Sequence, residues 1–191
     1  SIEMPFFTMQ FFPDSIRSAD ILFLNFSFAQ LGRNAWALFS RVFLQLPDIF
    51  FNSIPAFGPL YHVSIPFVLI GIIVFTIRLF KEKQIEKQTQ MLALWGFLIT
   101  GIWVGLITYE VNINRVNIIF YPVILLCAYG ISLVVDKFGK LFPVIVAAYA
   151  VSSVLFFTTY FTEYAEESRY YYNRDFLDAV AEADSMEEYD S

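Results

Sequence analysis

The sequence predicts an all-α membrane protein with about four transmembrane helices, an aromatic segment at the outer membrane interface and a short acidic tail helix outside the cytoplasm. Three observations predict this class. The composition is 58% hydrophobic and only 16% charged, several long apolar runs carry almost no internal charge, and lysines are concentrated in two connecting loops. Ordinary soluble domains carry closer to about 25% charged residues. The lipid bilayer is therefore the expected solvent.

Four apolar runs are long enough to cross the hydrocarbon core. A helix rises about 1.5 Å per residue, so a span takes about 20 residues. Each run must be helical, because lipid offers no hydrogen-bond partners for open backbone groups. The runs are Ser64 to Leu79, extended outward by Leu60 to Val63, then Met91 to Tyr109, Asn117 to Val135, and Leu141 to Tyr160. Together they predict a four-helix transmembrane region over residues 63–160.

Basic residues indicate the orientation of these spans. The loop KEKQIEKQTQ and the preceding Arg78 hold four basic residues, and the loop DKFGK holds Lys137 and Lys140. Because loops rich in lysine and arginine remain in the cytoplasm, both loops are expected inside. Residues 1–62, the 109–116 loop and the tail then face outward. This arrangement predicts a multi-pass protein of the plasma membrane with an extracytoplasmic C-terminal tail.

The N-terminal segment, residues 1–62, is aromatic but contains five prolines, so one continuous span is not expected. Asn34 is the predicted N-cap of an amphipathic helix whose apolar residues follow the helical spacing as far as Leu46. Such a helix suits the membrane interface or ordinary packing on the other helices. Alternatively, Ile21 to Leu46 crosses the membrane, provided that protein masks Arg33 and Asn34.

The tail, residues 161–191, is strongly acidic, with ten carboxylates against two arginines in a chain whose net charge is -6. Asn173 is the predicted cap of a short helix with an apolar face from Phe176 to Ala181. One short helix cannot bury that face alone. It either docks on the outer loops or begins a soluble domain that is truncated here. Because the acids are gathered in the tail and the apolar body is nearly neutral, nucleic acid is not an expected partner.

Familiar catalytic patterns are absent from the sequence, which has no phosphate-binding glycine loop, no cysteine pair and one histidine, His62. One histidine and one cysteine cannot build a metal cluster, so neither a metal nor another cofactor is expected. The sequence starts at Ser1 without the pattern of a signal peptide. We therefore expect a piece of a longer protein.

The polar loop between the second and third spans, residues 109–117, is the main candidate for a binding site. Polar groups at the membrane edge are costly unless they are paired or contact a ligand. Arg115 presents fixed N–H donors that suit the phosphate of a lipid-linked substrate. The loop asparagines, which can donate to phosphate or sugar hydroxyls, are Asn112, Asn114 and Asn117. The alternative is a structural loop, in which Arg115 pairs with Glu110 and the asparagines cap helix ends.

Two longer stretches carry a resemblance to a known family. The run NSIPAFGPLYHVSIPFVLIGI, the basic loop after it and the run TYEVNINRVNIIFYPVILLCAYGI resemble the C-terminal half of bacterial GT-C type membrane glycosyltransferases. These are the dolichyl-phosphate-mannose protein mannosyltransferases and the aminoarabinose transferases. The resemblance covers roughly residues 45–180, and its most specific parts are the Asn-Ile-Asn-Arg-Val-Asn loop and the Phe-Tyr-Pro sequence that follows.

The resemblance implies a polyprenyl-phosphate-linked sugar as donor, direct displacement with inversion, and an active site at the outer membrane face. In such enzymes an arginine or lysine on an outer loop stabilises the lipid phosphate as it leaves, and Arg115 is the residue that fits this role. The family's catalytic acid lies in its first outer loop, and no residue of this chain matches it. The catalytic residue is therefore unknown, and the N-terminal half of the same enzyme is expected to supply it.

Two other functions compete with this glycosyltransferase of the cell envelope. One is a small non-catalytic integral membrane protein whose acidic outer tail binds a partner. The other is a transporter, which is less favoured because carriers place polar groups or broken helices near the membrane midplane. The four spans have almost no polar groups there.

Overall fold

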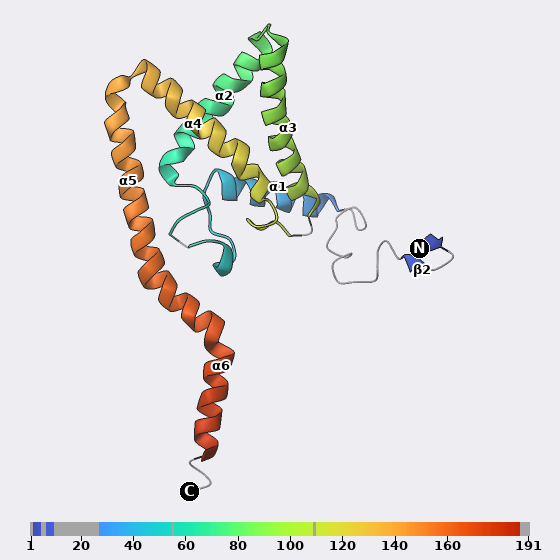
Figure 1. Cartoon of the computed structure of the whole chain (residues 1–191), viewed down its shortest axis with the longest axis vertical. Helices are drawn as coiled ribbons and strands as arrows, with labels where there is room; N and C mark the ends of the chain where they lie inside the picture. The colour runs from blue at the N-terminus through green and yellow to red at the C-terminus, as the bar shows by residue number, and fades with distance from the viewer. Residues whose placement is uncertain (1, 5–6, 10–26, 55, 109, 188–191) are drawn as a thin grey trace. The chain divides into compact units, whose positions relative to one another are not determined.

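The computed structural model describes residues 2–4, 7–9, 27–54, 56–108 and 110–187, and the chain forms two compact units, Ser1–Phe142 and Pro143–Ser191 (Figure 1). The elements of the first unit are β1 (Ile2–Met4), β2 (Phe7–Met9), α1 (Phe28–Val42), α2 (Ile65–Lys81), α3 (Ile85–Ile107) and α4 (Phe120–Lys137). The strands β1 and β2 form an antiparallel pair. The second unit consists of α5 (Phe142–Thr159), which starts at the boundary, and α6 (Ala165–Glu187).

Four helical segments of the described chain are long and apolar enough to cross a membrane. They are His62–Lys81, Ile85–Ile107, Asn117–Lys137 and Gly139–Tyr171. Because each one overlaps a predicted apolar run, the prediction of an all-α membrane protein with four spans is confirmed. The helix α3 begins at Ile85 rather than at Met91, since residues 85–90 contain no glycine or proline and continue the helix. Only residues 82–84 connect α2 to α3.

The helix α1 does not start where the sequence predicted. Its N-cap is Ser27, whose hydroxyl accepts the N–H of Gln30 at 3.4 Å, so the prediction of Asn34 as the cap is wrong. Asn34 lies inside α1 with only 2% of its surface exposed, and its amide donates to the carbonyls of Leu106 and Thr108. These carbonyls belong to the end of α3, where the helix has no internal donors for its last turn.

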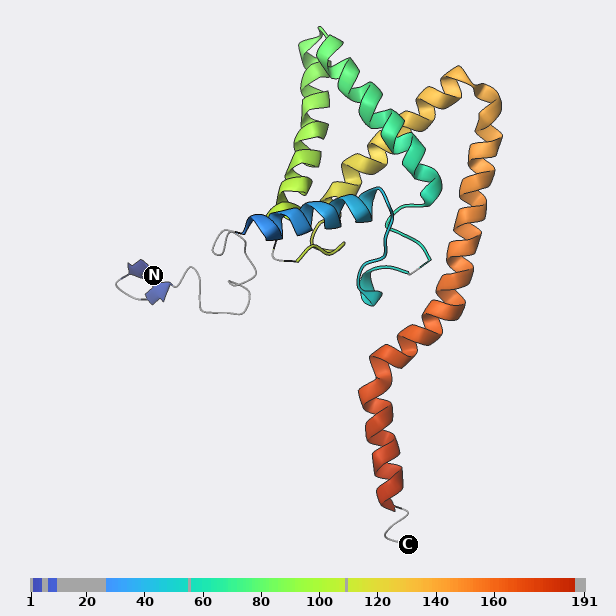
Figure 2. The same ribbon diagram turned by 180° about the vertical axis from the view of Figure 1, so that it is seen from behind.

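This contact places α1 across the end of α3, as both views of the molecule show (Figures 1 and 2). At 15 residues α1 is shorter than the roughly 20 residues that a span requires. The alternative prediction of a span from Ile21 to Leu46 lies partly outside the described residues. In the described part, the helix ends at Val42.

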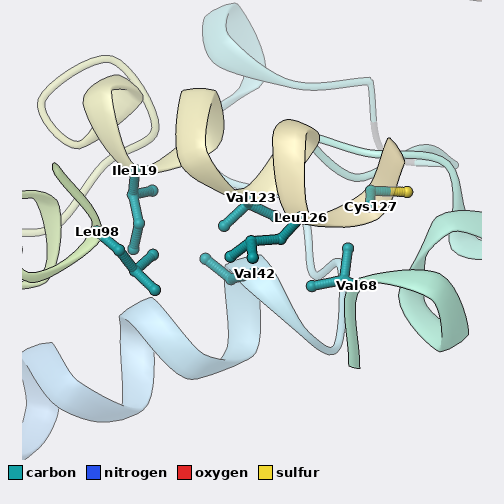
Figure 3. Packing of buried hydrophobic residues seen from close by; sticks show 7 residues of the cluster. All are labelled: Val42, Val68, Leu98, Ile119, Val123, Leu126 and Cys127. Carbon is teal, nitrogen blue, oxygen red and sulfur yellow. The ribbon is translucent and has the colours of Figure 1, made fainter. Parts of the chain in front are cut away.

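The helices α2 and α4 cross at two glycines. An added Cβ at Gly71 would lie 1.9 Å from the carbonyl oxygen of Leu126, and one at Gly130 would lie 2.0 Å from the carbonyl oxygen of Phe67. Small residues allow helix backbones to approach this closely, which is the usual way in which helices pack inside lipid. The buried cluster beside the crossing joins four helices and consists of Val42, Val68, Leu98, Ile119, Val123, Leu126 and Cys127 (Figure 3).

In the second unit, α5 continues through a π-helical turn, η5 (Tyr160–Tyr164), into α6. The rings of Tyr160 and Tyr164 stack across this turn with centroids 5.6 Å apart. The prediction that Asn173 caps the tail helix is wrong, because α6 begins at Ala165 and passes through this position. The tail helix is therefore longer than the sequence predicted.

Candidate functional site

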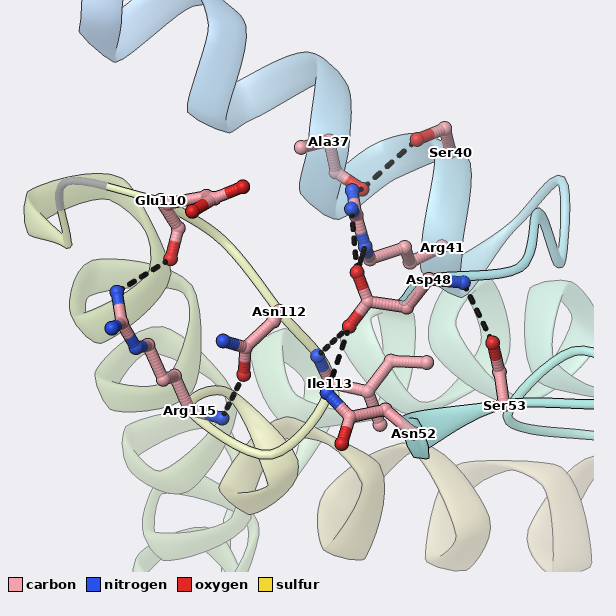
Figure 4. Close-up of polar contacts among 10 residues, drawn as sticks. All are labelled: Ala37, Ser40, Arg41, Asp48, Asn52, Ser53, Glu110, Asn112, Ile113 and Arg115. Atoms are coloured by element: carbon pink, nitrogen blue, oxygen red, sulfur yellow. Dashed lines mark hydrogen bonds and ion pairs between the residues drawn. The ribbon is translucent and has the colours of Figure 1, made fainter. Parts of the chain in front are cut away.

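The candidate site lies where α3 ends and α4 begins, and its centre is the carboxylate of Asp48. The side chain of Asp48 is only 2% exposed and accepts two hydrogen bonds from Arg41, at 2.9 Å from Nη2 and 3.2 Å from Nε (Figure 4). Its other oxygen accepts the backbone N–H of Ile113 at 2.7 Å and an amide N–H of Asn52 at 3.4 Å. One buried carboxylate thus binds α1, the segment after it and the 109–117 loop together.

A second contact strengthens this connection. The amide of Asn114 donates to the side-chain oxygen of Asn52, whose own amide donates to the Asp48 carboxylate. The backbone N–H of Asp48 donates to the hydroxyl of Ser53 at 2.8 Å, which fixes the turn that presents the carboxylate. We call this set the Asp48 junction, and its members are Arg41, Asp48, Asn52, Ile113 and Asn114.

The junction also determines the charge of Asp48. Burial by itself raises the pKa of this carboxyl, but the N–H of Ile113 and the guanidinium of Arg41 outweigh burial, with a further contribution from Asn52. The pKa of Asp48 is therefore held below its ordinary value of 3.8. The carboxylate of Asp48 accepts hydrogen bonds from both Arg41 and Ile113, so Asp48 holds the loop against α1 and the segment after it.

The lowered pKa of Asp48 predicts that the junction weakens in acid. A carboxyl whose pKa is lower in the folded than in the unfolded protein contributes stability that is complete above the unfolded pKa. That contribution is lost as the pH falls through the folded pKa. Between about pH 6 and about pH 3, we therefore expect the thermal unfolding temperature to fall further for the wild type than for Asp48→Asn. Parallel declines in the two proteins would contradict this account.

The structure places Arg115 on the surface of the loop. Its backbone N–H donates to Oδ1 of Asn112 at 2.9 Å, and its Nη1 donates to the carbonyl oxygen of Glu110 at 3.2 Å (Figure 4). The contact with Glu110 is thus made through the main chain.

The three predicted asparagines do not share one role. Asn112 closes the turn that carries Arg115, and Asn114 belongs to the Asp48 junction. These two contacts fit the structural interpretation of the loop, in which the amides define its conformation. Asn117 is exposed at the start of the 3₁₀ turn η3 (Asn117–Ile119), which leads into α4. Among the predicted site residues, Arg115, Asn114 and Asn117 are exposed, and Asn112 is partly buried.

A second fixed turn precedes α2. Gln45 has a positive φ of 53°, is 3% exposed, and accepts the N–H of Leu60 at 2.7 Å. A Cβ at Gly58 would lie 2.5 Å from the Gln45 side chain, so only glycine fits there without displacement. This contact explains how the proline-rich segment before the first span is held at the same end of the molecule as the 109–117 loop.

Sequence reasoning missed Asp48 and Arg41 as parts of the site. The available signal was an acid directly after Pro47 in an apolar stretch, seven residues beyond an arginine. The partners of this segment lie far along the chain, since Ile113 is 65 residues after Asp48 and Asn114 is 62 residues after Asn52. Within the residues that the structure describes, no group of three or more His, Cys, Asp or Glu side chains could hold a metal ion.

Comparisons of this chain with protein-family models, with curated proteins and with solved structures find no match.

Proposed function

We propose that this chain is the C-terminal transmembrane portion of a glycosyltransferase that moves a sugar from a polyprenyl-phosphate carrier to an acceptor. Arg115 binds the carrier phosphate in this proposal. The observation that supports it most directly is the exposed Arg115 on a short loop whose backbone is fixed by the buried Asp48 junction. A cation held in place before the reaction stabilises developing negative charge without reorganisation.

The phosphate would approach from the membrane. Arg115 lies between the candidate spans Ile85–Ile107 and Asn117–Lys137, so its guanidinium is close to the ends of two lipid-facing helices. A polyprenyl phosphate keeps its chain in the hydrocarbon and its phosphate at the membrane surface, which is the depth that this loop occupies if both helices span. Arginine suits this ligand, because its planar guanidinium can donate two hydrogen bonds to one phosphate.

The proposal assigns the loop and the acidic tail to the outer face of the plasma membrane. The lysines after α2 and after α4 support this orientation, because they lie at the opposite ends of those spans. The resemblance places the catalytic acid in a first outer loop that no residue of this chain matches, so this acid would belong to a part of the enzyme outside this chain. Asn117, which is exposed two residues after Arg115, would contact the phosphate or the sugar.

Substitution of Arg115 tests this proposal in the native protein that contains this chain. We expect Arg115→Ala to lower kcat/KM for sugar transfer by at least about tenfold to a hundredfold, since each hydrogen bond lost to a charged group costs about that much. Arg115→Lys should keep part of the activity, because it keeps the charge but not the bidentate geometry. The assay would follow labelled sugar from a synthetic polyprenyl phosphate in reconstituted membranes.

The matched control is Arg33→Ala, which removes another exposed arginine, on α1, whose guanidinium contacts only Gln30 among the described hydrogen bonds. Activity of Arg33→Ala should equal that of the wild type. The unfolding temperatures of Arg115→Ala, Arg115→Lys and Arg33→Ala should all agree with that of the wild type. Equal activity of Arg115→Ala and Arg33→Ala would remove Arg115 from the site. A wild-type protein that transfers no polyprenyl-linked sugar would favour the non-catalytic membrane protein instead.

A further inference from the structure

The opposite end of α3 from Arg115 carries a basic groove. It has a volume of about 590 Å³ and lies where α2 ends, α3 begins and α4 passes beside them. Its apolar wall includes Phe75, Met91 and Tyr129, one from each of the three helices. We call it the basic groove, and it forms entirely within the first unit.

Three cations line this groove. Arg78 and Lys81 lie in the last turn of α2, and Lys87 lies in the first turn of α3. All three side chains are exposed, and in the part of the chain that the structure describes none of them is within 4.0 Å of a carboxylate. Lys87 interacts with Glu82 only at longer range, so the three cations outnumber the single carboxylate that lines the groove.

The aromatic wall orients one of these cations. The guanidinium carbon of Arg78 lies 5.5 Å from the centroid of the Tyr129 ring, within the range of a cation–π contact. The ring of Tyr129 packs edge-on against Phe75 with centroids 5.6 Å apart. Arg78 is thus held over the apolar wall instead of extending into solvent, and its N–H donors remain at the edge of the groove.

The acid that lines the groove, Glu82, is committed to the backbone. Its Oε1 accepts the N–H groups of Lys83 and Gln84 at 3.0 and 2.9 Å, which closes the tight connection between α2 and α3. The hydrogen bond from Gln84 is the largest cause that lowers the pKa of Glu82, so this side chain stays ionised. Three cations against one occupied carboxylate leave the groove with a net positive charge.

The groove lies at the end of two candidate spans, because His62–Lys81 ends and Ile85–Ile107 begins there. This is the depth of lipid headgroups if both helices cross the bilayer. We propose that the basic groove binds the headgroup of an anionic phospholipid, with Arg78, Lys81 and Lys87 on the phosphate and an acyl chain along Phe75 and Met91. Clusters of basic residues between transmembrane helices recognise anionic headgroups in this way. The proposal is independent of the function proposed for Arg115.

Native mass spectrometry of the detergent-solubilised native protein tests this inference. Lipid would be added as dioleoyl phosphatidylglycerol or as dioleoyl phosphatidylcholine, which share their acyl chains and differ in net charge. We expect tighter retention of phosphatidylglycerol by the wild type. The triple variant Arg78→Gln, Lys81→Gln, Lys87→Gln should lose this lipid by about a hundredfold in apparent affinity, since each basic residue near the surface contributes about fivefold. The double variant Lys81→Gln, Lys87→Gln, which retains Arg78, should lose about twentyfold in apparent affinity for phosphatidylglycerol.

The matched control is the triple variant Lys83→Gln, Lys137→Gln, Lys140→Gln. It removes the same charge from the same end of the spans, and none of its residues lines the groove. This control should keep the lipid within about twofold. Equal loss in the two triple variants, or equal retention of the two lipids by the wild type, would overturn the proposal. Displacement of the lipid by millimolar inorganic phosphate would also overturn it, because it would identify a free anion as the ligand.

Discussion

Gly71→Ala is expected to force α2 and α4 apart and to destabilise the protein by about 3 kcal/mol or more, the upper part of the range for overpacking. The added Cβ would lie 1.9 Å from the carbonyl oxygen of Leu126, whereas ordinary contacts begin at 3.4 Å. The obstacle is backbone, so no change of rotamer can relieve it. Separation of the helices would also open the buried contacts of Val68 and Leu126. Unfolding of the detergent-solubilised protein by a rising fraction of sodium dodecyl sulfate measures this effect.

Gly96→Ala provides the matched control for this prediction. It makes the same chemical change in the apolar part of α3, where an added Cβ would meet nothing within 4 Å. Alanine is the better helix former, so this variant should be as stable as the wild type or more so. Gly71→Ala combined with Gly130→Ala should cost little more than Gly71→Ala alone, because the separated helices accommodate both methyl groups. Equal unfolding curves for Gly71→Ala and Gly96→Ala would refute the close crossing.

Asp48→Ala is expected to cost about 3 kcal/mol and to release the 109–117 loop, because it leaves the half-buried Arg41 without its carboxylate. The variant also removes the acceptor of the Ile113 N–H, which is 2.7 Å from Asp48 in the wild type. We therefore expect faster hydrogen exchange at the backbone amide of Ile113, together with a lower unfolding temperature. Under the proposed function, sugar transfer should fall as well, because Arg115 is carried by this loop.

A double-mutant cycle separates the ion pair from the loop contact. Arg41→Ala alone should destabilise, but Arg41→Ala combined with Asp48→Ala should cost less than the sum of the single changes, since the pair is shared. Exchange at Ile113 should respond to Asp48→Ala and only weakly to Arg41→Ala, because the N–H bonds the carboxylate directly. Unchanged exchange in Asp48→Ala would show that this carboxylate does not hold the loop.

The transmembrane helices could be predicted from sequence because their signal is local. A helix in lipid must satisfy its own backbone and present apolar side chains, so length and composition suffice. The start of α1 could not be predicted in this way. Asn34 has the chemistry of an N-cap, but its amide bonds the carbonyls of Leu106 and Thr108, more than 70 residues away. Only the tertiary fold reveals that Ser27 performs the capping instead.

The same distinction applies to the candidate site. The composition of the 109–117 loop identified Arg115 and its neighbours, because an arginine and three asparagines between two apolar helices are unusual. The residue that holds the loop, Asp48, gave no comparable signal in the sequence. Its carboxylate accepts hydrogen bonds from Arg41 and from Ile113, and Ile113 lies 65 residues further along the chain. Asn112 and Asn114 each stabilise the loop through a side-chain hydrogen bond. That they also contact a ligand stays a prediction.

The amide of Asn34 also limits how the protein can respond to the thickness of its bilayer. The last carbonyls of α3 are occupied by a side chain from α1, so this end cannot wind further without breaking that contact. In a thicker membrane, the mismatch must be absorbed by thinning of the lipid around the helix, because tilting would shorten the helix along the membrane normal. The protein therefore imposes its own hydrophobic length on the membrane at this end of α3.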